Sequence, residues 1–392
     1  MVLYIFNPDT DLALANGKGN YTPTEGVRQM MRDLAILPVW YAKSGSKVIA
    51  SVKDNQEYVL GMGNVFDMYF DVTDLSDLKK NDFQERINVW GWNHSICSML
   101  RRAGVPAKCL PTDQELTQRR HLSQRKMVAA MLERFEGQEG FCGISHNVAD
   151  IVDCEQYFNS LKDKGGMVVK QPWSSSGKGL LWCRDDFNDR DRNWCQRVIL
   201  DQGYVAVSPI YNNVHDFAME FFVGDEPNRA ASFFGYSLFD TDARGQYRGN
   251  ALMSNEAIEY RLTKYVPKER LERTRQVVAD FLVANGYQGH VGVDMMVCHE
   301  QEGIRIHPCV EINYRRTMGM LARNLSDSYL SLETQGRFMI QHFNTHTDLL
   351  DFVVTHERRS PLLVIDGVVK RGFMPLVPIM PTTLNLAYIE VK

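Results

Sequence analysis

Polar and apolar residues alternate in the segment 310–315. Glu311, Asn313 and Arg315 are each separated from the next by one apolar or aromatic residue. In a β-strand, successive side chains point to opposite faces, so these three polar side chains would share one face. Two oxygen donors and a guanidinium on one face suit a hydrated metal ion beside a phosphate or a carboxylate. The pattern also fits an ordinary hairpin whose charges form a cross-strand ion pair.

A second apolar stretch, upstream of the first, supplies another carboxylate. The segment 290–297 is predicted to be a strand that carries Asp294, and the polar, glycine-containing segment 298–305 is typical of a hairpin connection. An antiparallel pair would place Asp294 beside Glu311 and Asn313. Oxygen ligands suit Mg²⁺, which usually keeps several waters and bridges to substrate phosphates. The hairpin therefore predicts a magnesium and phosphate site.

Two lysines and a loop of small residues form another candidate site. A short apolar strand is predicted to end at Lys170, and the Ser- and Gly-rich loop that follows it contains Lys178. Small residues let backbone N–H groups approach phosphate oxygens, and Lys178 adds a point charge. The loop is not a Walker A loop, because Pro172 and Gly179 occupy positions where that motif needs Gly and Ser or Thr. A surface hairpin that binds nothing is the alternative.

Together, the two motifs resemble the ATP-grasp superfamily over residues 122–319. In that superfamily, a lysine on a strand and a Gly-rich loop cover the nucleotide, while an Asp and a later Glu-x-Asn pair hold two Mg²⁺ ions. The resemblance implies that Lys170 contacts the adenine and the α-phosphate. It implies that the loop residues Ser174, Ser175, Ser176, Gly177, Lys178 and Gly179 close over the β- and γ-phosphates, and that Asp294, Glu311 and Asn313 bind Mg²⁺, with Mn²⁺ as a substitute.

The resemblance also implies a basic residue that touches the α-phosphate from a helix. Residues 122–132 have the apolar spacing of a helix, with Ser123 as the predicted N-cap. We take Lys126 as the phosphate contact and Arg125 as the alternative. Basic residues in a first turn oppose the helix dipole, which is a small cost that an anionic ligand would relieve. A solvated pair of basic residues is the other interpretation.

The segment 204–210 lies where the superfamily has the hinge whose backbone pairs with adenine. The resemblance implies that Val207 and Ile210 are neighbours of the adenine. Many members have a glutamate near this point, whereas this chain has Ser208 and Pro209. Because backbone recognition does not need a particular side chain, the nucleotide prediction stands while the residue that replaces the glutamate is left open.

The composition is typical of a globular enzyme. The chain has 392 residues, of which 44% are hydrophobic and 23% charged, and a formal net charge of −4. These values exclude a disordered chain and do not favour bulk nucleic-acid binding. No apolar run reaches the roughly 20 residues of a membrane helix, and we expect a cytoplasmic protein without a signal peptide. The eight cysteines form no Cys-x-x-Cys pair and the ten histidines no metal spacing, so we expect reduced thiols and no zinc.

The order of the predicted elements indicates an α/β (α+β) protein, and the resemblance implies an ATP-grasp fold. The expected lobes are an N-terminal α/β lobe of parallel strands at 1–120, a small ATP-grasp lobe at 121–210, a central antiparallel lobe with the metal ligands at 211–325, and a C-terminal extension at 326–392. Residues just past strands of the first lobe are candidates for contact with a second substrate: Asn7, Asp9, Asp11, Trp92 and Asn93.

The pattern also predicts individual elements outside the two motifs. In the first lobe we expect a helix at 24–37 and strands at 2–6, 47–50, 58–60 and 88–90. In the extension we expect a helix at 328–343 and a buried strand at 361–365. We expect the segment punctuated by Pro375, Pro378 and Pro381 to wrap the surface instead of pairing as a central strand.

The resemblance implies a ligase that joins a carboxylate to an amine. A substrate carboxylate would attack the γ-phosphorus of ATP, and an amine would then attack the acyl phosphate. Arg315, Lys178 and Arg248 are the predicted catalytic cations, Arg248 as the one that binds the acyl carboxylate. A small-molecule kinase and a nucleotide-binding module without turnover are the alternatives. We expect small-molecule partners, with a homodimer as one candidate assembly.

Overall fold

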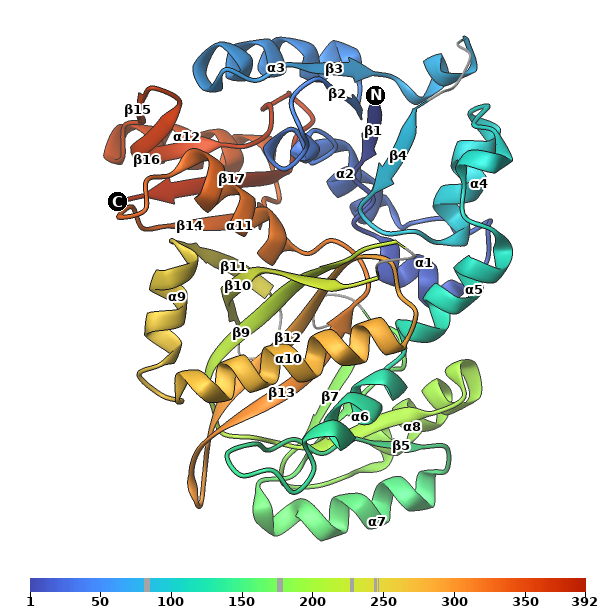
Figure 1. Ribbon diagram of the computed structural model, residues 1–392. Coiled ribbons are helices and arrows are strands. Elements are labelled where there is room, and N and C mark those ends of the chain that lie inside the picture. The colour runs from blue at the N-terminus through green and yellow to red at the C-terminus, as the bar shows by residue number, and fades with distance from the viewer. Residues whose placement is uncertain (81–84, 175–178, 226–228, 243–244, 246) are drawn as a thin grey trace. The chain divides into compact units, whose positions relative to one another are not determined.

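The computed structural model describes residues 1–80, 85–174, 179–225, 229–242, 245 and 247–392 (Figure 1). Its contacts divide the chain into two compact units. The first contains Met1–Thr117, Arg248–Ala257 and Arg316–Lys392, and the second contains Gln118–Tyr247 and Ile258–Arg315. The expected N-terminal lobe and C-terminal extension lie largely in the first unit. The expected ATP-binding lobes lie largely in the second unit, except for residues 248–257 and 316–325, which belong to the first.

A parallel sheet forms the N-terminal part of the first unit, as the sequence predicted. Its strands are β1 (Val2–Ile5), β2 (Ser46–Ile49), β3 (Phe70–Thr73) and β4 (Arg86–Val89), in the order β3-β2-β1-β4. Each neighbouring pair is parallel. The order places β1 between β2 and β4, so the direction in which successive strands are added to the sheet reverses beside β1.

Helices connect these strands, and two of them differ from the prediction. The expected strand at 58–60 lies inside α3 (Val52–Phe66), where Asn55, Val59 and Phe66 are buried at the spacing of a helix face. The expected helix at 24–37 ends early, because α2 is followed by a 3₁₀ turn that contains a proline. The helices of this region are α1 (Thr10–Asn16), α2 (Glu25–Asp33), α4 (His94–Arg102) and α5 (Asp113–Leu122).

An antiparallel sheet forms the C-terminal part of the first unit, with the order β11-β14-β17-β16-β15. The expected helix at 328–343 is wrong, because α11 ends at Tyr329 and residues 336–342 form β14. Pro375 ends β16, and Pro378 and Pro381 lie in the connection between β16 and β17, outside any strand, as expected. β15 has exposed side chains instead of buried ones. The elements are β11 (Tyr247–Leu252), α11 (Met318–Tyr329), β14 (Gly336–His342), α12 (His346–Arg359), β15 (Leu363–Ile365), β16 (Val368–Pro375) and β17 (Asn385–Val391).

The second unit contains a small sheet that carries the predicted strand, loop and strand. β6 (Met167–Lys170) ends at the predicted lysine and pairs with β7 (Leu180–Cys183), and the order is β5-β8-β6-β7. β8 (Val205–Pro209) covers the expected hinge. Together with β5 (His146–Val148), these strands share a buried apolar cluster with α7 (Ile151–Leu161) and α8 (Asp189–Gln202).

The second unit also contains the antiparallel sheet β13-β12-β9-β10. β12 (Gly289–Glu300) and β13 (Gly303–Asn313) form the predicted hairpin, with a tighter turn than the sequence suggested. β9 (Asn213–Val223) and β10 (Ala231–Thr241) extend the sheet, and α10 (Lys268–Ala284) packs along one face of it (Figure 1). The remaining helices are α6 (Lys126–Leu132), which packs against β13, and α9 (Asn255–Leu262).

Two expectations from composition agree with the structure. All eight cysteines are free thiols. Across the described parts of the chain, none of the helices combines the length and apolar character needed to cross a membrane.

Candidate nucleotide and metal site

Asp294 and Glu311 face each other across the hairpin of β12 and β13. They are direct cross-strand partners, and Gly292 is opposite Asn313. All three polar side chains therefore lie on one face of the sheet. Asn313 Nδ2 donates to Asp294 Oδ2 at 3.0 Å, and Arg315 Nη2 donates to Asn313 Oδ1 at 2.9 Å. The predicted strand pairing is confirmed, and Arg315 reaches the same group.

Negative charge accumulates on this face. Burial raises the pKa of Asp294 well above its usual range, and the carboxylates of Glu311 and Glu220 raise it further. The guanidinium of Arg315 and the hydrogen bond from Asn313 act in the opposite direction. A bound cation would favour the ionised form of Asp294, because it would offset the repulsion between the carboxylates.

The donor set fits a hydrated Mg²⁺ ion. It offers two carboxylates and one amide, all with hard oxygen atoms. Asn313 presents its nitrogen to Asp294 and its oxygen to Arg315. To bind a metal beside Asp294 through Oδ1, the side-chain amide would have to rotate by half a turn. The two orientations have nearly the same shape. Among the described residues, no three His, Cys, Asp or Glu side chains gather at a metal-binding distance. The site therefore suits an ion that takes its other ligands from water and phosphate.

Glu220 is a functional candidate that the sequence did not identify. It is opposite Gly292 on β9, so it shares the face that carries Asp294. It is buried and accepts a hydrogen bond from Ser237 Oγ at 3.1 Å. Glu220 stands among apolar residues of β9, but the cross-strand register that brings it to this face could not be predicted from the sequence.

Arg125 reaches the carboxylate of Glu311 from the start of α6. Its Nη2 lies 2.8 Å from Glu311 Oε1 and 3.3 Å from Ser174 Oγ, and its Nη1 donates to the carbonyl of Val310 at 3.1 Å. The side chain is 7% exposed. Arg125, which the sequence placed second, thus joins the predicted loop to the predicted metal strand.

Lys126, the first choice from the sequence, is placed differently. Its ammonium lies 4.7 Å from the ring centroid of Tyr204, and its side chain is exposed. The expected helix at 122–132 begins only at Lys126, and Ser123 is not its N-cap, since Ser123 Oγ donates to the carbonyl of Arg119 at the end of α5. The break between α5 and α6 turns Arg125 inward and Lys126 outward.

Lys170 is a buried cation at the end of β6. Burial lowers its pKa to about 8, and the neighbouring guanidinium of Arg125 lowers it further, while Glu311 raises it. The two cations are thus withdrawn from water, whereas Glu311 beside them keeps 32% of its side chain exposed. Such a group suits an anionic ligand, which would supply the missing negative charge.

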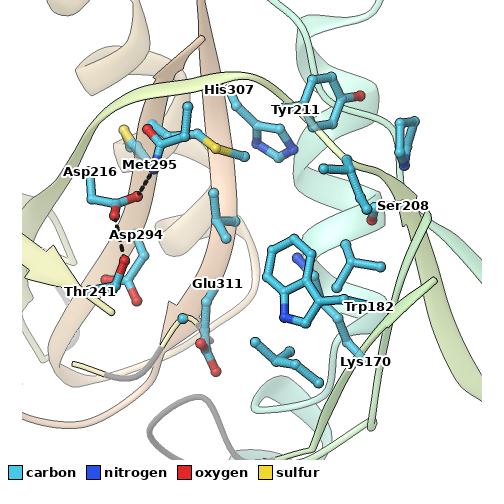
Figure 2. Close-up of a pocket in the computed structure, with 18 of the residues that line it drawn as sticks. Lys170, Trp182, Ser208, Tyr211, Asp216, Thr241, Asp294, Met295, His307 and Glu311 are labelled. Atoms are coloured by element: carbon cyan, nitrogen blue, oxygen red, sulfur yellow. Dashed lines mark hydrogen bonds between the residues drawn. The ribbon is translucent and has the colours of Figure 1, made fainter. Parts of the chain in front are cut away.

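A cavity of about 190 Å³ lies between the small sheet and the hairpin, within the second unit. Figure 2 shows Lys170, Trp182 and Ser208 on one side, Asp294 and Glu311 on the other. Most of the wall is apolar, and two cations and three carboxyl groups also line it: Arg125, Lys170, Asp216, Asp294 and Glu311. The apolar lining comes from Val168, Leu180, Trp182, Pro209, Ile210, Phe239, Met295, Met296 and Val310. The apolar lining together with the cations Arg125 and Lys170 suits a flat heterocycle that carries an anionic group.

His307 closes the end of the cavity beside Tyr211 (Figure 2). The two ring centroids are 5.0 Å apart. Burial and the nearby charge of Lys170 lower the pKa of His307 to about 3, so the imidazole is neutral. His307 stands four positions before Glu311 on the same strand, but nothing in the sequence marked it as part of the site. It becomes a wall of the cavity only because the small sheet lies opposite.

The two hinge residues from the sequence differ in placement. Ile210 lines the cavity, whereas Val207 is fully buried in the apolar cluster of the small sheet. Ser208 and Pro209 also line the cavity. The segment that the resemblance identified as the hinge therefore contributes a wall.

Part of the predicted phosphate loop can be placed. Ser174 contacts Arg125, and Gly179 has a φ of +87°. A Cβ atom on Gly179 would lie 2.9 Å from Gln171 Oε1, so the position favours glycine. The predicted contacts Ser175, Ser176, Gly177 and Lys178 lie outside the described residues.

Arg248 belongs to the first unit, where its side chain is exposed on β11. It is not among the residues that the second unit brings together around the cavity, and its role stays a prediction.

The candidates for a second substrate also belong to the first unit. Asn7 Nδ2 donates to the carbonyl of Gly91 at 2.7 Å, and Asn93 Oδ1 caps α4 by accepting from the backbone of Ile96 at 3.0 Å. Burial raises the pKa of Asp9 to about 6. Both asparagines therefore have structural partners, and a role in substrate binding stays a prediction.

Comparisons with known proteins find similarity in the structure but no significant match in the sequence. No protein-family model matches the sequence, and no curated protein matches it significantly. The structure is similar to the biotin carboxylase domain of 2-oxoglutarate carboxylase from Hydrogenobacter thermophilus, with 12% identity and a TM-score of 0.51 over 100% of this chain and 86% of that chain. That protein was solved as a dimer with MgADP, ADP and bicarbonate.

Two further solved structures have lower scores. Biotin carboxylase from Campylobacter jejuni has a TM-score of 0.49 at 10% identity, over 100% of this chain and 87% of that one. N5-carboxyaminoimidazole synthetase from Staphylococcus aureus has a TM-score of 0.47 at 11% identity, over 100% of this chain and 93% of that one. At such identities, the likeness to the Hydrogenobacter protein establishes the fold alone: this chain has the α/β ATP-grasp fold that its motifs predicted.

Proposed function

We propose that this chain is an ATP- and Mg²⁺-dependent ligase that joins a carboxylate to an amine through an acyl phosphate and releases ADP and phosphate. The observation that carries the proposal is the pair of buried cations, Arg125 and Lys170, that line a largely apolar cavity beside Glu311. A nucleoside triphosphate matches both parts, because its base is flat and its phosphates are anionic. The ATP-grasp fold supports the same ligand.

In this proposal, the cations and the loop contact the phosphates, and the hinge segment contacts the base. Lys170 and Arg125 bind the phosphates, with Arg125 in the position first assigned to Lys126. The loop residues 174–179 cover the β- and γ-phosphates and keep water from the intermediate. The adenine lies against Ile210, and the backbone near Val207 supplies its hydrogen bonds.

The polar face of β12 and β13 is the proposed metal site. Asp294, Glu311 and Asn313 are the ligands of two Mg²⁺ ions, for which Mn²⁺ is a substitute. Bound Mg²⁺ would neutralise phosphate charge and so lower the barrier to attack by an anion. Glu311 also pairs with Arg125, which links the metal site to the phosphate site.

Arg315, which donates to Asn313 on the polar face, takes the role that the sequence first assigned to Arg248, that of positioning the acid substrate for the first step. A carboxylate oxygen forms a bond to the γ-phosphorus while the bond from that phosphorus to the β,γ-bridging oxygen breaks, and ADP leaves. The amine nitrogen then attacks the acyl carbon, phosphate leaves, and the nitrogen loses a proton. Lys178 and Arg248 are proposed to stabilise the charge that develops on the phosphoryl and acyl groups.

The test is ADP release with ATP and Mg²⁺ across pooled small carboxylic acids and amines. We expect release that needs both pools and that is lost in Glu311→Ala and Asn313→Ala. Glu139→Ala is the matched control, because Glu139 is exposed and outside the cavity. Failure of the wild-type protein to bind ATP would overturn the proposal.

Product analysis then separates a ligase from a kinase. With a carboxylic acid labelled with ¹⁸O in its carboxylate, the proposed reaction transfers one labelled oxygen to inorganic phosphate. A kinase would instead leave a stable phosphorylated product that accumulates without the amine. The second result would replace the ligase with a kinase on the same nucleotide site.

A further inference from the structure

Three aromatic side chains extend the polar face of the sheet β13-β12-β9-β10, the face that carries Asp294. Phe222 on β9 is opposite His290 on β12, and His290 stands two residues before Gly292 on the strand that carries Asp294. Residues two apart share a face, so both rings lie on the polar face. The ring centroids of Phe222 and His290 are 4.9 Å apart, and those of Phe234 and His290 are 6.4 Å apart. We call Phe222, Phe234 and His290 the aromatic patch.

A local irregularity of β10 explains how Phe234 joins this patch. The pairing of β10 with β9 shifts between Phe233 and Gly235. Phe233 packs against Phe221 on the opposite face, with ring centroids 5.6 Å apart. A bulge inserts an extra residue and redirects the side chain, which allows two consecutive phenylalanines to serve opposite faces.

The aromatic patch is unusual because it is accessible. Phe222 is 39% exposed and Phe234 is 36% exposed, whereas Phe221 is fully buried. Single exposed apolar residues need no explanation, but three neighbouring rings beside a charged site indicate a binding surface.

The order of residues along the face places the patch beyond the metal site. The cavity reaches Met296 and His307 on one side of Asp294. The patch lies on the other side, with His290 four residues before Asp294, or about 13 Å along the strand. A nucleotide with its base in the cavity and its phosphates at Asp294 would therefore direct the γ-phosphate toward the patch.

Arg315 lies between these two regions. It donates to Asn313, whose partner Gly292 belongs to the row of residues next to Phe222 and His290. A carboxylate held near Arg315 would thus have its phosphate donor on one side and the aromatic patch on the other.

We propose that the aromatic patch binds the ring of the acid substrate, so that the acids this enzyme activates are carboxylic acids that carry an aromatic group. The inference rests on the proposed function. Aromatic side chains favour an aromatic ligand over an aliphatic one of equal size, because edge-to-face and offset contacts add to the burial of apolar surface. The acid's carboxylate oxygen attacks the γ-phosphorus and ADP leaves, as in the first step above.

The experiment compares matched acids. ADP release is measured with ATP, Mg²⁺ and a fixed amine pool, using 3-phenylpropionate and 3-cyclohexylpropionate, then benzoate and cyclohexanecarboxylate. We expect the phenyl acid of a pair to have the higher kcat/KM. In Phe222→Leu and Phe234→Leu, kcat/KM for the phenyl acid should fall about 10-fold, while KM for ATP stays unchanged and the preference over the cyclohexyl acid is largely lost.

Tyr260→Leu is the matched control, because Tyr260 is also an exposed aromatic residue but stands on α9. It should leave all four acids unaffected. Melting temperatures of the variants check that each is folded.

The outcomes separate the two proposals. If ATP binds but the cyclohexyl acids are used as well as the phenyl acids, or neither phenyl acid stimulates release, the aromatic patch is not the acid site and the inference is overturned. It is also overturned if both phenylalanine variants keep the wild-type kcat/KM. If ATP itself does not bind, the proposed function fails first.

Discussion

The two faces of the sheet β13-β12-β9-β10 are built from the same strands, but one face stabilises the fold and the other gathers ionisable side chains. On the face covered by α10, Phe221 and Val293 are fully buried among apolar neighbours, and this burial stabilises the fold. On the other face, Glu220 is equally buried, and burial together with neighbouring carboxylates raises the pKa of Asp294. Adjacent residues of one strand thus divide between stability and a charge cluster that a ligand would stabilise.

The largest expected effect comes from the polar face. Asp294→Asn should lower kcat by about 10³-fold, because the carboxylate proposed to bind the metal is replaced by a neutral amide of the same shape. The variant should be at least as stable as the wild type at neutral pH, because it removes repulsion with Glu311 and Glu220. Steady-state kinetics and thermal unfolding check the two parts.

Asp201→Asn is the control for that variant, because Asp201 is exposed on α8. It should change neither kcat nor the melting temperature. A clear drop in the melting temperature of Asp294→Asn would show that Asp294 stabilises the fold, and the contrast between the two faces would then be wrong at this residue.

The apolar face should respond in the opposite way. Phe221→Ala should destabilise the protein by about 3–5 kcal/mol, because it removes a fully buried ring and leaves a cavity. Phe222→Ala, one residue along and 39% exposed, should cost less than about 1 kcal/mol. Denaturant unfolding of both variants measures the difference. Equal losses of stability would contradict the assignment of Phe221 and Phe222 to opposite faces.

A smaller effect is expected from the cations opposite the polar face. Arg125→Lys should raise KM for ATP about 10- to 100-fold, because a lysine cannot reproduce the contacts to Glu311 and Ser174 that the planar guanidinium makes. Lys126→Ala should change KM less than about 2-fold, because that ammonium lies over Tyr204. Isothermal titration with ATP gives the same comparison without turnover. A larger effect at Lys126 would restore the assignment made from sequence.

The polar face was the most predictable part of the molecule. Alternation along 310–315 and a single carboxylate in an apolar strand were enough to predict that Asp294 and Glu311 pair, because a strand has only two faces and a hairpin only a few registers. The aromatic patch was not predictable in this way, since the redirected Phe234 depends on an irregularity that leaves no clear mark in the sequence.

Helix boundaries limited the prediction of the cations. A helix over 122–132 with Ser123 as N-cap points Lys126 toward the ligand, whereas the break at 123–125 points Arg125 there instead. A shift of one residue rotates a helical side chain by about 100°, so an error in the start changes which residue binds.

The prediction of the C-terminal elements failed for a different reason. Residues 336–342 form β14 because they pair with β17, and a Cβ on Gly336 would lie only 2.6 Å from the carbonyl of Glu390. Such long-range pairing overrides local preference. The walls of the cavity, such as Trp182 and His307, likewise come together only when two sheets are assembled.

The smallest expected effect is a pH dependence that tests whether Lys170 behaves like the buried charges of the polar face. As the pH rises through about 8, Lys170 loses its proton in the free protein, so KM for ATP should rise. Because this folded-state pKa lies below the ordinary value of 10.5, the unfolded chain binds more protons between the two values, and the nucleotide-free protein should become more stable with pH across that interval. Lys170→Met should remove both trends. Identical pH profiles of KM and of melting temperature in the two proteins would show that the buried ammonium neither binds the nucleotide nor opposes folding.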